Sequence, residues 1–146
     1  MSKRFAIGID GGKKTGFAVW DRSMHEFMKL ESCDFWTAYK YVVDHFTPKN
    51  AELFIEDPSQ NKPVFMKKGV RNNKAFSKVA QNVGGVKRET NLLIEGIELE
   101  GFDVKRIVPR KGSLTKIKAE PFRNITGYEG ITNEHSRDAA MMVFQR

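Results

Sequence analysis

Apolar and polar residues alternate in blocks at the start of the chain, which predicts strands joined by short turns. Residues 4–10 and 15–20 are apolar runs separated by a glycine-rich turn, and residues 24–32 are a third, less regular run. From Phe35 the apolar residues recur at steps of three and four, a spacing typical of an amphipathic helix that Asp34 would cap. We therefore expect a meander of three strands followed by a helix.

The rest of the chain alternates strands with helices. Residues 52–56 form a short apolar strand, residues 75–100 a long helix, and residues 102–108 a fifth strand. Residues 113–126 are irregular or form a short helix, and a last helix begins after Asn133. The order β-β-β-α-β-α-β-α predicts an α/β fold with a mixed five-stranded sheet and helices on both faces. It matches the ribonuclease H-like layout, although on pattern alone several other α/β folds stay open.

The long helix has an apolar stripe and an interruption. Gly84 and Gly85 interrupt it, and each mid-helix glycine costs about 1 kcal/mol relative to alanine. Close packing of the helix is the simplest explanation, and a kink or the approach of a backbone phosphate are the alternatives. The stripe consists of Phe76, Val79, Ala80, Val83, Thr90, Leu93, Ile94 and Ile97.

Composition excludes several classes of protein. The 146 residues are 40% hydrophobic, which suffices for the core of one domain over residues 1–146. No run approaches the roughly 18 apolar residues of a membrane helix, and the first residues lack the apolar segment of a signal peptide. The single cysteine, Cys33, excludes an internal disulfide and a zinc site built from cysteines. We expect a cytoplasmic protein with no membrane partner.

The charge is basic, and its excess is local. The net charge is +7, and the segment from Lys62 to Arg123 holds 15 basic and 6 acidic residues. A solvated surface without a charged partner would mix the two signs, so the pattern favours a polyanion such as DNA. Within this segment Phe65 lies among lysines, where an exposed aromatic ring could stack on an unpaired base. The alternative for Phe65 is a loop anchor that folds onto the core.

Three acidic residues and a histidine stand where strand and helix ends would meet. Asp10 and Glu56 each end an apolar strand, where an isolated charge costs several kcal/mol unless it is paired or bound to a metal. In the last helix, steps of about 100° per residue put His135 and Asp138 on the same stripe as the apolar Met142. If the first and fourth strands are neighbours in the sheet, all four side chains converge.

Such a cluster requires cations. Oxygen ligands with one imidazole suit Mg²⁺ or Mn²⁺, and two ions about 3.5–4 Å apart can activate a water and stabilise the leaving oxygen of a phosphodiester. The turn Gly11-Gly-Lys-Lys14 beside Asp10 leaves room and positive charge for a phosphate. Asp21, in a turn, and Asp57, on the opposite face by alternation, are interpreted as structural.

Three motifs occur in a fixed order along the chain. They are Ile7-Gly-Ile-Asp10-Gly-Gly-Lys-Lys-Thr-Gly16, Phe54-Ile-Glu56 and His135-Ser-Arg-Asp138-Ala-Ala-Met. Together they resemble the RuvC family of Holliday junction resolvases over nearly the whole chain, and the compact length is more similar to the phage or viral members. The resemblance implies a ribonuclease H-like fold and a homodimer whose two metal-dependent sites nick a four-way DNA junction symmetrically.

The resemblance also implies roles for individual residues. Lys105 and Lys116 match basic positions in or near the family's active site, where they would hold the scissile phosphate or stabilise developing charge; ordinary surface lysines are the alternative. Residues 64–66 resemble the loop whose aromatic residue wedges into the junction centre, although the insertion at residues 58–63 departs from the family pattern. The family's metal-binding tetrad maps onto Asp10, Glu56, His135 and Asp138.

The sequence thus predicts a divalent-metal-dependent DNA endonuclease that resolves four-way junctions as a homodimer. We expect two Mg²⁺ or Mn²⁺ ions per site, Lys116 as a further catalytic residue, and no nucleotide cofactor. The alternatives are a ribonuclease H-type or other branched-structure nuclease, an actin-like or sugar-kinase ATPase, which would need two such domains, and a non-catalytic junction-binding protein. The residues expected to contact DNA are Lys13, Lys14, Phe65, Lys67, Lys68, Arg71, Lys74, Lys105, Lys111 and Lys116.

Overall fold

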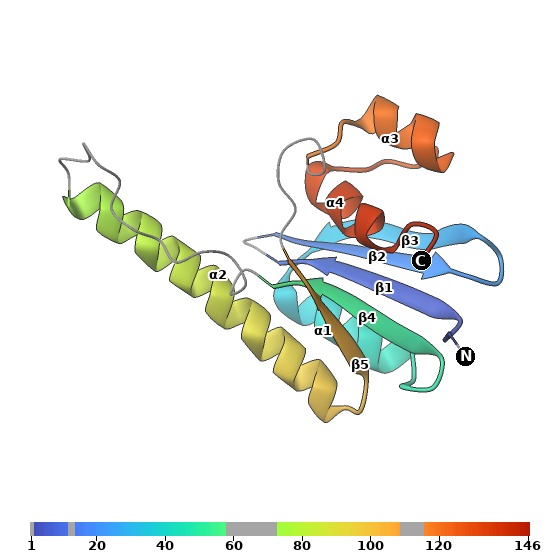
Figure 1. Ribbon diagram of the computed structural model, residues 1–146, viewed down its shortest axis with the longest axis horizontal. Coiled ribbons are helices and arrows are strands. Elements are labelled where there is room, and N and C mark those ends of the chain that lie inside the picture. The colour runs from blue at the N-terminus through green and yellow to red at the C-terminus, as the bar shows by residue number, and fades with distance from the viewer. Residues whose placement is uncertain (1, 12–13, 58–72, 109–115) are drawn as a thin grey trace.

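The structure is a computed structural model that describes residues 2–11, 14–57, 73–108 and 116–146 (Figure 1). For residues 73–84 and 86 it describes the course of the helix and not the side chains. Within these residues a five-stranded sheet has the order β3-β2-β1-β4-β5. The strands are β1 (Phe5–Asp10), β2 (Thr15–Asp21), β3 (Glu26–Cys33), β4 (Ala51–Glu56) and β5 (Asp103–Ile107).

Strand directions follow from the connections along the chain. Short turns join β1, β2 and β3, so these strands pair antiparallel, whereas β4 and β5 are each reached through a helix and lie parallel to their neighbours. As a result β2 alone runs against the other strands. The prediction of an α/β fold with a mixed five-stranded sheet is confirmed.

The helices begin where the capping residues predict. Asp34 accepts a hydrogen bond from the N–H of Thr37, and Asn133 and Ser136 form a reciprocal capping box. Of the helices that the structure describes, none is both long and apolar enough to cross a membrane. The helices are α1 (Phe35–His45), α2 (Asn73–Leu99), α3 (Ala119–Thr126) and α4 (Glu134–Val143).

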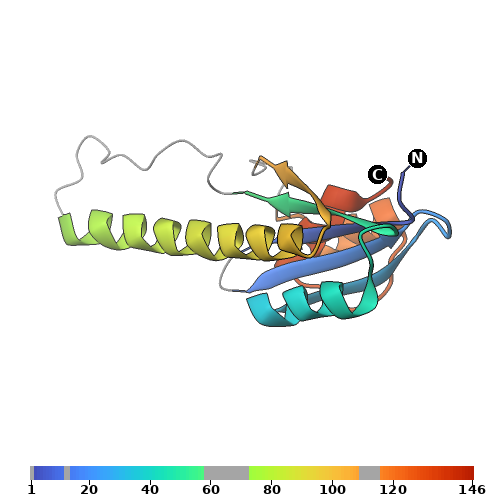
Figure 2. The ribbon, with the colours of Figure 1, turned by 90° about the horizontal axis from the view of Figure 1, so that it is seen from below.

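Helices cover both faces of the sheet, as predicted (Figures 1 and 2). Because side chains alternate along a strand, Ile7 and Ile9 of β1 face one way, into a core shared with α1 and α2. Ala6 faces the other way, into a second core with α3 and α4. The position of a residue along β1 therefore decides which pair of helices it meets.

Two glycines let α4 lie directly on the sheet backbone. A Cβ added at Gly8 of β1 would collide with the carbonyl oxygen of Ala139, and a Cβ added at Gly16 of β2 would collide with that of His135. Any larger residue at either position would push the helix away. This contact fixes the start of α4 above the end of the β1–β2 hairpin.

Helix α2 packs against the sheet by its carboxyl-terminal half and projects beyond it by its amino-terminal half (Figures 1 and 2). Thr90, Leu93, Ile94 and Ile97 are buried, which confirms this part of the predicted stripe, whereas the side chains of its first four members lie outside the described residues. The helix continues through the two glycines. A Cβ on the exposed Gly85 would meet no described atom within 4 Å.

Candidate active site

Asp10 and Glu56 lie side by side at the carboxyl ends of adjacent parallel strands. Ile9 pairs with Ile55, so the two acidic residues that follow stand at the same level of the sheet. Both lie on the face covered by α4, because they alternate with residues that face the opposite core. Asp10 is buried and Glu56 is half-buried.

Helix α4 brings the other two predicted residues to the same place. The backbone of His135 lies over Gly16, which pairs with Asp10, and His135 Nδ1 is 4.0 Å from Asp10 Oδ2. Asp138 follows about one turn later and is half-buried. The four side chains predicted from the sequence therefore gather at one end of the sheet, beneath the start of α4.

These carboxyl groups act on one another electrostatically. Burial, followed by the negative charges of Glu56, Asp138 and Glu134, raises the pKa of Asp10 from 3.8 to about 8. Burial also raises the pKa of Asp138, although a hydrogen bond from the backbone N–H of Lys116 opposes this rise. Asp10 therefore prefers either a proton or another positive charge at neutral pH.

Glu134 is a member of the cluster that sequence reasoning missed. It stands in the first turn of α4, and its charge contributes to the raised pKa of both Asp10 and Asp138. Its carboxylate is also 4.0 Å from the ammonium of Lys116. The only signal in the sequence was its place directly before His135, which also fits an ordinary acidic residue at a helix start.

Lys116 joins the site through its backbone as well as its charge. Its N–H donates a hydrogen bond of 2.8 Å to Asp138 Oδ1, and its backbone has a positive φ of 55°. Such a conformation is uncommon for a residue other than glycine. Its side chain is exposed, so the same residue orients one carboxylate and presents a cation beside the site.

The other residues expected to contact DNA lie in separate parts of the chain. Lys14 is exposed next to the start of β2. Lys105 pairs with Phe54, and its ammonium is 3.7 Å from Glu52, near the opposite end of β4 from Glu56. Lys74 lies in the first turn of α2, and its side chain is not described. Lys13, Phe65, Lys67, Lys68, Arg71 and Lys111 lie outside the described residues.

Asp21 and Asp57, interpreted as structural, are buried against arginines. Asp21 stands at the opposite end of the β1–β2 hairpin from Asp10, 2.9 Å from Arg4. The Arg4 hydrogen bond holds the pKa of Asp21 well below its usual range. Asp57 is 3.1 Å from Arg106. Each has an arginine partner, whereas the basic group paired with Asp10 among the described residues is the imidazole of His135 at 4.0 Å.

The donor set at this site fits a hard divalent cation in its chemistry. Asp10, Glu56 and Asp138 supply carboxylate oxygens and His135 an imidazole nitrogen, ligands that suit Mg²⁺ or Mn²⁺. Among the described residues, however, no three His, Cys, Asp or Glu side chains are grouped closely enough to hold a metal ion. The indication of a cation is therefore the raised pKa of the buried Asp10 carboxyl, and not a complete set of ligands around an ion site.

The fold and the acidic cluster together define the class of this protein. It is an α/β protein with an acidic site at the carboxyl ends of the parallel strands β1 and β4. No protein-family model matches the chain, and no curated protein matches it. A functional assignment therefore depends on the chemistry of the site residues and on the charge of the chain.

Proposed function

We propose that this protein is a divalent-metal-dependent DNA endonuclease with a ribonuclease H-like fold, and that it resolves four-way junctions. The observation that carries the proposal is the buried carboxyl of Asp10, whose pKa is raised to about 8 beside Glu56 and Asp138. Retaining such a group costs folding free energy, and a bound cation offsets that cost. Catalytic sites commonly hold residues perturbed in this way.

Strand order and charge support the finer parts of the proposal. The order β3-β2-β1-β4-β5 with β2 antiparallel is the arrangement expected of a ribonuclease H-like sheet. The net charge of +7 favours a polyanionic substrate. Choosing a four-way junction over other nucleic acids depends on the resemblance of the three sequence motifs to the RuvC family, which also implies a homodimer with two equivalent sites.

The residues of the site take distinct roles in this proposal. Asp10, Glu56 and Asp138 hold the cations, and His135 is either a further ligand or the group that orients the attacking water. Lys116 orients Asp138 by its N–H and places its ammonium near the scissile phosphate. Two bound Mg²⁺ or Mn²⁺ ions would supply activation of the water and stabilisation of the leaving oxygen.

The test is cleavage of a synthetic mobile four-way junction with Mg²⁺ or Mn²⁺. We expect paired, symmetrical nicks from the natural protein and none from Glu56→Gln or Asp138→Asn, both of which should still bind the junction. A folded Glu56→Gln variant that loses binding and cutting together would contradict the assigned role. An RNA–DNA hybrid, a fork and a flap serve as parallel substrates, and preferential cutting of the hybrid would favour a ribonuclease H-type activity.

A further inference from the structure

Three large apolar side chains lie exposed on the outer surface of the helix layer formed by α1 and α2. Trp36 of α1 is 70% exposed, and Leu92 and Leu99 of α2 are 52% and 88% exposed. Both helices cover the same face of the sheet, so their outer sides form one surface (Figure 2). Apolar side chains that gather on one surface, rather than lying scattered, indicate a site for a partner.

The contact between the two helices shows that these side chains are neighbours. A Cβ added at Gly96 of α2 would lie 3.0 Å from the ring of Tyr39, so α1 and α2 touch at this point. The helices run in the same direction (Figure 2), and Trp36 lies about one turn before Tyr39, as Leu92 lies about one turn before Gly96. The rings of Trp36 and Tyr39 meet edge-on with their centres 6.0 Å apart. Trp36 therefore stands beside the contact at the level of Leu92.

The exposed leucines form the line of α2 that lies farthest from the sheet. With Leu92 at zero and about 100° per residue, Leu99 lies at about 340°. The buried residues of the same turns, Leu93, Ile94 and Ile97, lie at about 100°, 200° and 140°, on the opposite side. A helix with only water on its outer side carries polar residues there. Leucines seven residues apart on that side are instead typical of a helix that packs against a second helix.

Charged residues on the two sides of this line complement each other. Arg88 lies about 40° to one side of Leu92 and Glu89 about 60° to the other, and both are exposed. A two-fold axis parallel to α2 sets each side of the helix against the opposite side of its copy, so Arg88 of each copy would meet Glu89 of the other. Lys40 of α1 and Glu95 of α2 are exposed on opposite sides in the same way. No ion pair between described residues includes any of these four charged side chains, so the surface is complementary to a second copy of itself.

The position of the acidic site favours one direction of pairing. A Cβ added at Gly11, the residue after Asp10, would lie 2.6 Å from Thr90 Oγ1, so the acidic site is level with the part of α2 that holds Leu92. Helix α2 projects beyond this end of the sheet (Figures 1 and 2). If α2 lies parallel to its copy, both sites open at the same end of the dimer, whereas antiparallel pairing turns them to opposite ends. Symmetrical nicking of one four-way junction needs the parallel arrangement.

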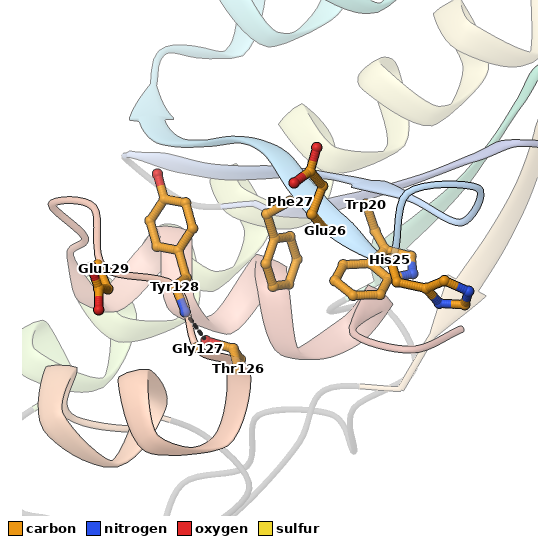
Figure 3. Close-up of a pocket in the computed structure, with 8 residues that line it drawn as sticks. All are labelled: Trp20, His25, Glu26, Phe27, Thr126, Gly127, Tyr128 and Glu129. Carbon is orange, nitrogen blue, oxygen red and sulfur yellow. Dashed lines mark hydrogen bonds between the residues drawn. The ribbon is translucent and has the colours of Figure 1, made fainter.

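The pocket in Figure 3, on the opposite face of the sheet, does not suit a second copy. It lies between the β2–β3 turn and the end of α3, and Trp20, which lines it, is only 4% exposed. Glu26 and Glu129 also line it, without a lysine or arginine among its described lining residues. Two copies that met there would bring carboxylates together and would cover no exposed indole.

We propose that two copies of this chain pair through the outer surface of α1 and α2, with α2 parallel to its copy about a two-fold axis. Leu92 and Leu99 then meet the same residues of the other copy along the axis. Arg88 pairs with Glu89 of the other copy, and Trp36 is covered at the side. An apolar centre with charged groups around it is the usual composition of such an interface. The inference deepens the proposed function by naming its dimer surface, and it rests on that function only for the direction of pairing.

Sedimentation equilibrium of the full chain, in EDTA and without DNA, tests the interface. We expect a dimer for the natural protein. Leu92→Glu should raise the dissociation constant of the dimer about 100-fold or more, because each dimer would then bury two carboxylates. Ile131→Glu is the matched control, since Ile131 is 98% exposed and follows α3 on the other face of the sheet, and it should leave the association unchanged. Circular dichroism should show both variants folded, because neither position is buried.

Tryptophan emission reports on the same association. The chain has two tryptophans, and Trp20 is buried, so an emission shift to shorter wavelength as the protein concentration rises reports that Trp36 becomes covered. We expect this shift in the natural protein and not in Leu92→Glu.

A mixture of charge variants tests the direction of pairing. Arg88→Glu and Glu89→Arg should each weaken the association, because each sets like charges against one another in a parallel dimer. An equimolar mixture of the two variants should restore it, since opposite charges then meet at both contacts. Consecutive residues of a helix do not face each other, so the rescue cannot arise within one chain. In an antiparallel dimer Arg88 would lie near Glu95 of the other copy, and the mixture would not restore the association.

Crosslinking gives a second measure of the direction. In a Cys33→Ala background, a short bismaleimide should join Leu99→Cys to its copy, because the two positions face each other across the axis. Antiparallel pairing centred on Leu92 would separate them by about 21 Å along the helix. Glu129→Cys, exposed at the pocket of Figure 3, should not be joined and serves as the control.

The outcomes separate this interface from the proposed function, since all the measurements are made without DNA or metal. A natural protein that sediments as a monomer, or a dimer that Leu92→Glu leaves intact, overturns the interface even if junctions are cut. A dimer with neither charge rescue nor a Leu99→Cys crosslink is paired in another direction and also overturns it. A parallel dimer that cuts no junction would support the interface and refute the nuclease.

Discussion

Replacing Asp10 by asparagine should stabilise the metal-free protein while abolishing its cleavage activity. The carboxyl of Asp10 is buried and faces the charges of Glu56 and Asp138, so its ionised form is disfavoured in the folded state. Asparagine has nearly the same shape and carries no charge. The substitution therefore removes an electrostatic cost of folding together with a metal ligand.

The raised pKa of Asp10 sets the size and the sign of the effect. The folded protein holds this proton up to a pKa of about 8, whereas the unfolded chain releases it near 3.8. The contribution of Asp10 to the free energy of unfolding is therefore fully present below pH 3.8 and is lost as the pH rises from there to about 8. At pH 7 the loss is about 4 kcal/mol, and Asp10→Asn should recover it, which raises the melting temperature by about 10 °C.

Urea unfolding in EDTA, followed by circular dichroism between pH 4 and 8, measures the effect. The gain in unfolding free energy for Asp10→Asn should be small at pH 4 and grow with pH. Asp21→Asn is the matched control, since Asp21 lies at the other end of the same hairpin with its pKa lowered by Arg4, and its substitution should destabilise. Saturating Mg²⁺ should stabilise the natural protein, by about 2.7 kcal/mol at 100 times the dissociation constant, and not Asp10→Asn.

One result would refute this reasoning. If Asp10→Asn is less stable than the natural protein at pH 7 in EDTA, and the difference does not change with pH, then Asp10 is an ordinary paired carboxylate. The cluster would then carry no electrostatic demand for a cation, and the main support for a metal-dependent activity would be lost.

Substitutions at three further positions test the site and the helix packing. In single-turnover assays His135→Asp should keep substantial Mg²⁺-supported cleavage, because a carboxylate can replace imidazole as a ligand, and His135→Ala should lose most of it. Normal cutting by the alanine variant would show that this histidine is structural. Gly16→Ala should lower the free energy of unfolding by about 1–3 kcal/mol and slow cleavage, since its Cβ collides with the His135 backbone; an unchanged urea midpoint would contradict the close packing of α4. Gly85→Ala should instead raise the free energy of unfolding by up to about 1 kcal/mol, and a simultaneous loss of junction binding would indicate that this glycine admits a backbone phosphate.

The sequence by itself determined the features that depend on local spacing. Alternation along β1 places Asp10 on the same face as Ala6, and about 100° per residue places His135 and Asp138 on the inner side of α4. The caps at Asp34 and Asn133 marked where two helices begin. These properties depend on residues within a few positions of one another, so they can be predicted without knowing the path of the chain.

Only the tertiary structure decided which distant groups meet. The pairing of β1 with β4 places Glu56 beside Asp10. Because Gly16 has no Cβ, the backbone of His135 can lie against it, and this contact sets the start of α4 above the two acidic residues. The charge of Glu134 and the backbone N–H of Lys116 then enter the site from positions whose local sequence has no distinctive pattern. Such contacts arise from the packing of whole helices and strands. The reason for a glycine at such a position becomes clear only when the helix that packs against it is known.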